Sequence, residues 1–403
     1  MDEADRFLDT LKRPITRREL LRRAGHGSMY LGAMAFLAAC GVQGQRRQGG
    51  DRLEPLPPRA GEVVMANWPL YIDKEGGRSP TLIGFREETG VHIRYQVAIN
   101  DNEEFFATIR EPLSRGEPTG WDIIVVTDWM VAKMIQLGYL ERLHHDRLPN
   151  FEAEAADKFK DPWYDPDNAH SIPWAAGITG IGYDVSLTGR DLTSVHDLFD
   201  PAFAGRVGMF LEMRDTFGLA LAALGIRSAD ATVEDVERAQ QLLLDNRDSF
   251  RGFYGNDYTE QLATGNLVAS MAWSGDIFAL QLDNPNLRFI IPEEGGMRWV
   301  DNMVIPAGAE HPTDAHMFMD YVYQPRIAAN ITEWVWYEPP VAEVEQIVQE
   351  DVAGGGPGYL KQLAESDLVF PDEGTLAQTI PYKRLDLEEE QIWNDLFQQV
   401  VQG

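Results

Sequence analysis

From Val63 onward, short apolar runs alternate with segments of helical periodicity, and this alternation constrains the fold more than any other feature of the sequence. Apolar runs of this length suit β-strands, and helices between successive strands are typical of a sheet with parallel neighbours. The run WDIIVV at 121–126 is almost continuously apolar, which favours a strand buried on both faces. The pattern therefore predicts an α/β fold.

Capping residues set the expected ends of several helices. Ser79 precedes Pro80 and Gly90 closes the same segment, and Thr232 and Asp235 have the spacing of a capping box. We expect strands at 62–68, 91–97, 121–126, 206–211, 266–273, 287–292 and 302–308. We expect helices at 79–90, 101–116, 127–138, 215–225, 232–246, 313–323, 326–334 and 386–400.

The first residues of the chain have the order of an export signal. The pair Arg17-Arg18 is followed by an apolar stretch that is too short to span a bilayer comfortably. That stretch ends at Cys40, the one cysteine of the sequence, and LAAC resembles the lipobox of bacterial lipoproteins. We predict a twin-arginine lipoprotein signal at 1–39 and a flexible tether at 40–60; the alternative is an amphipathic helix with a chance cysteine.

The net charge of −29 restricts the possible partners. Nucleic acid and anionic membrane surfaces would both repel such a chain. The acidity suits a cationic ligand, although diffuse acidity more often serves only to keep a protein soluble. With one cysteine, the fold has no internal disulfide and depends on its core.

Three common enzyme motifs are absent from the sequence. It contains no G-x-x-x-x-G-K-[ST] loop, no G-x-S-x-G elbow and no H-E-x-x-H helix. His144 and His145 are adjacent, so they would not share one face of a helix. We expect a binding protein without metal or cofactor.

Aromatic and acidic residues occur together near the ends of the expected strands, where open α/β sheets bind ligands. The aromatic ones are Trp68, Tyr71, Trp129, Trp273, Trp299 and Tyr337, and the acidic ones are Glu212, Asp215, Asp276 and Asp301. Each aromatic side chain has an alternative role in the core, and Asp215 and Asp276 have alternative roles as helix caps. Indole faces interleaved with carboxylates suit sugars or organic amines, and so many carboxylates favour the amine.

From about Glu62 onward the chain resembles the spermidine/putrescine-binding proteins of bacterial ABC importers. The stretches that carry the resemblance are NWPLYI, WDIIVVTDWMVAKMIQLGYLERL, SIPWAAGITGIGYD, FLEMRDTFGLALAALG, NLVASMAWSGD, PEEGGMRWVDNMVIPAGA and WYEPP. The resemblance implies a two-lobed periplasmic-binding-protein fold of type II with a hinge between the lobes. One lobe would comprise 61–181 and 301–348. The other would comprise 182–300 and 349–403.

The resemblance also implies a ligand slot and its residues. The implied ligand-binding set is Trp68, Tyr71, Thr127, Trp129, Glu212, Asp215, Trp273, Asp276, Trp299, Asp301 and Tyr337. Pro69 and Leu70 depart from the hydroxyl or acidic residues that relatives often have, and Trp129 replaces the more usual tyrosine. The four acids mix features of the spermidine and putrescine branches, so the length of the polyamine stays open.

The resemblance implies that the ligand is passed to a permease and an ATPase on separate chains. The protein would be an exported monomer in the periplasm or at the outer face of the cytoplasmic membrane, held there by its lipid anchor alone. Two alternatives remain: a receptor of the same fold for a sugar, an amino acid or iron, and a secreted hydrolase using Glu212 with Asp215 or Asp301.

Overall fold

The computed structural model describes residue 53 and residues 55–402. The predicted signal peptide, with Arg17, Arg18 and Cys40, lies outside the described residues, as does most of the tether. Within the described part of the chain, no helix combines the length and the hydropathy needed to cross a bilayer.

Ten strands form one mixed sheet in the described residues, with the order β2-β1-β3-β9-β4-β7-β5-β6, while β10 pairs with β9 and β8 with β4. The strands are β1 (Glu62–Asn67), β2 (His92–Val97), β3 (Ile123–Thr127), β4 (Ser171–Asp184), β5 (Val207–Phe210), β6 (Phe250–Tyr254), β7 (Ala269–Trp273), β8 (Leu287–Ile290), β9 (Gly296–Val304) and β10 (Thr379–Pro381).

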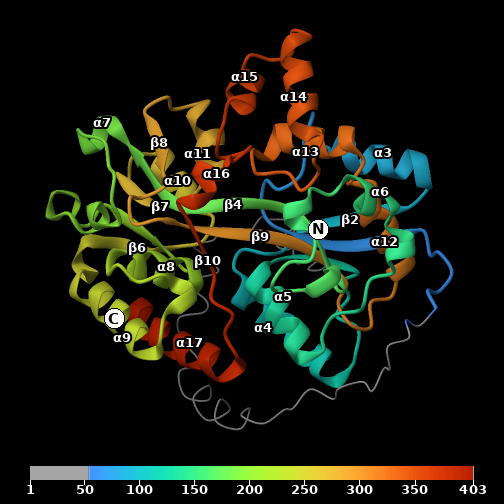
Figure 1. The fold of residues 1–403 in the computed structure, drawn as a ribbon, viewed down its shortest axis with the longest axis horizontal. Coiled ribbons are helices and arrows are strands. Elements are labelled where there is room, and N and C mark those ends of the chain that lie inside the picture. The colour runs from blue at the N-terminus through green and yellow to red at the C-terminus, as the bar shows by residue number, and fades with distance from the viewer. Residues whose placement is uncertain (1–52, 54, 403) are drawn as a thin grey trace, which may run out of the picture. The chain divides into compact units, whose positions relative to one another are not determined.

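Two parallel groups of strands, β2-β1-β3 and β7-β5-β6, are joined through the long strands β4 and β9. β9 runs antiparallel to β3 and to β4, and β4 runs antiparallel to β7 (Figure 1). The register places Thr127 opposite Asp301, Gly177 opposite Trp299, and Thr179 opposite Trp273. β4 and β9 therefore carry the connection between the groups, and the lobe boundaries given above remain predictions.

The helices connect the strands, and their ends follow the capping signals of the sequence. Ser79 caps its helix through the Leu82 amide, Gly90 ends it at φ 76°, and Thr232 and Asp235 form the predicted capping box. The helices are α3 (Pro80–Thr89), α4 (Asn102–Arg115), α5 (Asp128–Leu137), α6 (Pro149–Glu154), α7 (Val185–Thr188), α8 (Met213–Ala223), α9 (Val233–Asp245), α10 (Tyr258–Ala263), α11 (Ser274–Gln281), α12 (Pro312–Tyr321), α13 (Pro325–Val335), α14 (Val344–Ala353), α15 (Tyr359–Ala364), α16 (Glu373–Ala377) and α17 (Leu387–Gln402).

One predicted strand start was wrong, and the alternative capping roles of Asp215 and Asp276 are not observed. β9 begins at Gly296, six residues before the predicted start, so Trp299 lies within the strand. α8 begins at Met213 with Glu212 at its N-cap, and α11 begins at Ser274 with Trp273 at its N-cap. Asp215 and Asp276 thus lie in first turns and are not caps, which leaves their carboxylates free for tertiary contacts.

β4 was not predicted as a strand because glycines interrupt its apolar pattern. The tertiary contacts explain those glycines. A Cβ atom on Gly180 would lie 2.2 Å from the carbonyl oxygen of Ile290, and one on Gly182 would lie 2.6 Å from Cδ1 of Ile277. Close packing against β8 and α11 therefore requires residues without side chains at these positions.

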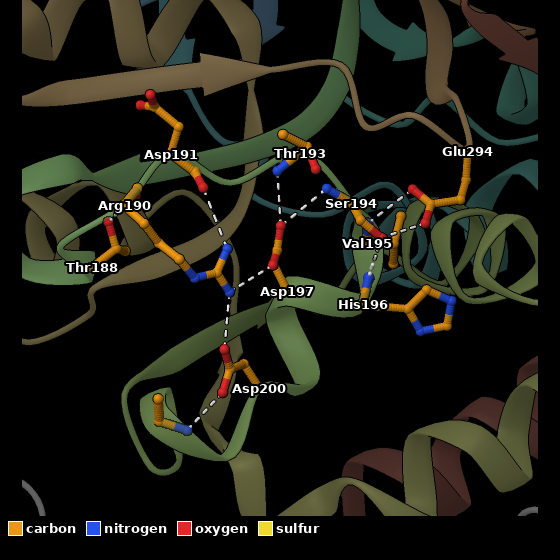
Figure 2. A network of polar contacts seen from close by, with 11 residues as sticks. Thr188, Arg190, Asp191, Thr193, Ser194, Val195, His196, Asp197, Asp200 and Glu294 are labelled. Carbon is orange, nitrogen blue, oxygen red and sulfur yellow. Dashed lines mark hydrogen bonds and ion pairs between the residues drawn. The ribbon is translucent and has the colours of Figure 1, made fainter.

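A polar network stabilises the segment that follows β4 (Figure 2). One guanidinium nitrogen of Arg190 lies 2.7 Å from the Asp197 carboxylate and 2.9 Å from that of Asp200. Asp197 also accepts the backbone N–H groups of Thr193 and Ser194. Partial burial opposes the charge on Asp197, but the hydrogen bonds from Arg190 and the backbone outweigh it and lower the pKa of Asp197.

Gly180→Ala tests the close contact between β4 and β8. We expect the substitution to lower the free energy of unfolding by about 1–3 kcal/mol, because the added methyl group would displace the Ile290 backbone. Urea denaturation measures the effect. Gly358→Ala is the control, since a Cβ there meets no atom within 4 Å; equal stability of the two variants would contradict the packing argument.

Candidate functional site

A cavity of about 410 Å³ lies at the carboxyl ends of parallel strands from both groups. Trp68 follows β1, Thr127 ends β3, Glu212 follows β5 and Trp273 ends β7. The structure brings all the predicted ligand-binding residues to this cavity: Trp68, Tyr71, Thr127, Trp129, Glu212, Asp215, Trp273, Asp276, Trp299, Asp301 and Tyr337. All are buried except Asp276, which is partly buried.

The aromatic side chains pack edge to face in two groups, which together form the aromatic wall of the cavity. The ring centroids of Trp299 and Tyr337 are 5.2 Å apart, and those of Tyr71 and Tyr337 are 5.5 Å apart at 88°. Trp68 meets Trp273 edge-on at 6.3 Å, and its indole N–H donates to the Val125 carbonyl at 3.0 Å. These contacts fix the orientations of the rings toward one another.

Two glycines make room for this wall. A Cβ on Gly177 would lie 2.4 Å from Cζ2 of Trp299, and one on Gly275 would lie 2.7 Å from Cζ of Tyr337. The rings therefore lie directly against the backbones of β4 and α11.

Asp301 and Asp276 are each held by two hydroxyl groups. Asp301 accepts from Tyr71 and from Thr127, both at 2.8 Å. Asp276 accepts from Tyr337 at 2.8 Å and from Tyr258 at 2.9 Å. Each carboxylate is thus fixed in orientation by groups that carry no positive charge.

Hydrogen bonds connect Glu212 to Asp301 through Asn102 and Thr127. Oε1 of Glu212 accepts from the backbone N–H of Asn102 at 2.9 Å and from its side-chain amide at 3.1 Å. The amide of Asn102 also donates to the Thr127 hydroxyl at 2.9 Å, which in turn donates to Asp301. This chain joins the end of β5 to the end of β3 and to the interior of β9.

Burial shifts the acid–base behaviour of these carboxyl groups. It raises the pKa of Asp301 to about 6, although the hydrogen bonds from Thr127 and Tyr71 oppose the shift. It likewise raises the pKa of Asp215 to about 6 against the hydrogen bond from Tyr382, whose hydroxyl lies 2.6 Å away. Burial, followed by the nearby charge of Asp101, raises the pKa of Glu212 well above its usual range, and burial raises that of Asp276.

Charge is strongly one-sided in this cavity. Among the described residues that line it, Glu212, Asp215, Asp276, Asp301 and Glu333 are acidic, and none is lysine, arginine or histidine. The Arg214 guanidinium lies 4.9 Å from the ring centroid of Trp129, but it pairs with Glu390 and does not line the cavity. The cavity can therefore stabilise a positive charge from outside the protein.

Sequence reasoning missed three of the residues that shape the site. Asn102, Tyr258 and Tyr382 hold the carboxylates of Glu212, Asp276 and Asp215 respectively. Asn102 and Tyr258 begin helices, and Tyr382 follows the short strand β10 near the end of the chain. No local pattern distinguishes them, since their partners are distant in the sequence.

The fold and the cavity define a class of protein, an α/β protein with an aromatic and acidic cavity at the ends of its strands. The model of the bacterial extracellular solute-binding protein family matches residues 84–353, and the chain belongs to this family.

Relatives with assigned ligands are similar over most of the chain. A spermidine/putrescine-binding periplasmic protein of Haemophilus influenzae is 27% identical over 72% of this chain and 78% of its own. A putrescine/agmatine-binding protein of Pseudomonas aeruginosa is 27% identical over 85% of this chain and 92% of its own.

A solved structure is also similar to this chain. A protein from Listeria monocytogenes, assigned as a spermidine/putrescine ABC transporter, is 26% identical, with a TM-score of 0.75 over 85% of this chain and 99% of its own. The predicted resemblance and the two-lobed periplasmic-binding-protein fold are confirmed.

Asp301→Asn tests the raised pKa in the ligand-free protein. The pKa of Asp301 is higher in the folded protein than in the unfolded chain. Between about pH 4 and 6 the folded protein therefore keeps a proton on Asp301 that the unfolded chain has released. The free energy of unfolding of the wild type, relative to the variant, should rise by about 1–2 kcal/mol as the pH falls from about 7.5 to 5. Urea denaturation at both pH values measures it, and a difference that is constant with pH would contradict the shift.

Proposed function

We propose that this protein is the substrate-binding component of an ABC importer and captures a polyamine, putrescine or spermidine, in the cavity. The observation that carries the proposal is the excess of buried carboxylates in an aromatic cavity whose described lining has no basic side chain. A neutral sugar would leave these carboxylates uncompensated, whereas ammonium groups pair with them. The ligands named for the relatives, spermidine, putrescine and agmatine, are all amines.

Each part of the cavity has a role in this proposal. Asp301 and Asp276 would each receive an ammonium group, since two hydroxyls already orient each carboxylate. Trp299 and Tyr337 lie beside them, and their faces would cover the methylene groups. A cation against an aromatic face contributes about 0.5–2 kcal/mol, and a charge-assisted hydrogen bond about 1.5–3 kcal/mol.

Closure of the two lobes would complete the site. Asn102 belongs to the first predicted lobe and Glu212 to the second, so their hydrogen bonds would form as the lobes close. Asn256 similarly reaches the carbonyl and side chain of Asn100. Ligand binding would shift the protein toward this closed form, which the permease would recognise.

Export, anchoring and partners follow from the same proposal. The chain would leave the cytoplasm through the signal marked by Arg17 and Arg18, be lipidated at Cys40 and be tethered by 40–60. It would act as a monomer, catalyse no reaction, and work with a permease and an ATPase on separate chains.

Loss of the Asp301 charge should weaken polyamine binding strongly. In a tryptophan fluorescence titration of the purified chain, putrescine or spermidine should give a saturable change. Asp301→Asn should weaken binding at least about 30-fold, because it removes the charge that two hydroxyls orient. Asp245→Asn removes an exposed charge at the end of α9 and should bind as the wild type does. A response to maltose instead of any polyamine would overturn the proposal.

Affinity should depend on pH in the direction set by the carboxyl groups. Asp215 and Asp301 have pKa values of about 6 in the ligand-free protein, so both become protonated as the pH falls below that value. A bound ammonium favours their charged forms, and binding therefore releases protons. Calorimetric titration should show affinity rising about tenfold or more from about pH 5 to 7.5. An affinity that falls over this range would contradict the assignment of these acids to the ligand.

A further inference from the structure

The cavity extends beyond its carboxylates to an apolar section, which we call the outer wall: Leu70, Leu280, Leu282, Trp334 and Tyr359. Four of these side chains are strongly exposed: Leu70 at 74%, Leu282 at 54%, Trp334 at 42% and Tyr359 at 37%. Exposed apolar groups that gather beside a ligand site mark a surface that a ligand or partner covers.

Two residues at the outer wall have a backbone conformation that is unfavourable for residues other than glycine. Leu70 has φ 56° and Trp336, next to the wall, has φ 61°, although neither is glycine. Conformations of this kind are strained for residues other than glycine, and they occur at ligand clamps among other places. Trp336 is further held between Phe278 and Tyr359, with ring centroids at 5.8 Å and 5.9 Å. The outer wall is therefore held in place by packing.

A second cavity of about 580 Å³ continues from the outer wall. It shares Pro69, Leu70, Tyr71 and Trp334 with the first cavity. Two more exposed apolar side chains line it, Ile83 at 38% and Val97 at 60%.

The charge reverses between the two cavities. Lys74, Arg78 and Arg86 line the second one, with Asp73 as the acidic residue among its described lining. An ammonium group is thus attracted to the first cavity and not to the second. An elongated ligand would place its amines at the carboxylates and an uncharged end over Leu70 and Trp334.

We propose that the ligands of this protein include polyamines with an apolar alkyl or arylalkyl substituent on one terminal nitrogen, the substituent lying against the outer wall. This inference rests on the proposed function, since the same carboxylates hold the amines. An alkylated amine keeps its positive charge at neutral pH, whereas an acylated one loses it. The alkyl class therefore satisfies both the acidic cavity and the apolar wall.

Calorimetry with putrescine and N-hexylputrescine tests the inference on the purified full chain. The two ligands carry equal charge and differ in the apolar group alone. N-hexylputrescine should bind about tenfold more tightly, because its chain is removed from water against the outer wall. Leu282→Ser and Trp334→Ser should each reduce this preference to less than about threefold while the affinity for putrescine stays unchanged. Leu387→Ser, at a leucine that is 45% exposed and lines neither cavity, is the matched control.

The outcomes separate the two proposals. If putrescine binds and N-hexylputrescine binds more weakly, the further inference fails and the proposed function stands. If the preference persists in both outer-wall variants, another part of the protein recognises the chain and the inference is also overturned. If neither amine binds, the proposed function itself is wrong.

Discussion

The pairing of β4 with β9 is the interaction on which the rest of the structure depends. These two strands join the parallel groups of the sheet, and β9 carries both Trp299 and Asp301 into the cavity. Opposite Trp299, Gly177 leaves the space that the indole ring fills. The strand pair that holds the two groups together is thus also the strand pair that forms one side of the site.

Electrostatics explains why such a site is specific. Burial makes each carboxylate costly in its charged form, and the raised pKa values of Asp215 and Asp301 express that cost. Hydroxyl groups from Tyr71, Thr127, Tyr258 and Tyr337 orient the acids without neutralising them. A cationic ligand of the proposed kind would compensate these buried charges, so part of its affinity would come from the cost of leaving them unpaired.

Much of the fold could be predicted because its signals are local. The apolar run at β3 and the caps at Ser79 and Thr232 all correspond to elements of the structure. β4 could not be predicted, because its glycines weaken the strand pattern and are explained only by Ile290, Ile277 and Trp299, which are distant in the sequence. The predicted site residues do meet in one cavity, because strand ends converge there and the resemblance marked the same positions. Asn102 and Tyr382 were missed, since their contacts with Glu212 and Asp215 join segments that lie far apart in the chain.

The sequence by itself determined the alternation of strands and helices, the acidic balance, and the placing of tryptophans and carboxylates at strand ends, because these follow from local pattern and composition. The tertiary structure alone decided which carboxylates are held by hydroxyls, which acids are buried enough to titrate near pH 6, and where the apolar outer wall continues from the site. Those properties depend on distances between residues from different parts of the chain, such as the 2.8 Å from Tyr71 to Asp301. Only the packed sheet brings such residues together.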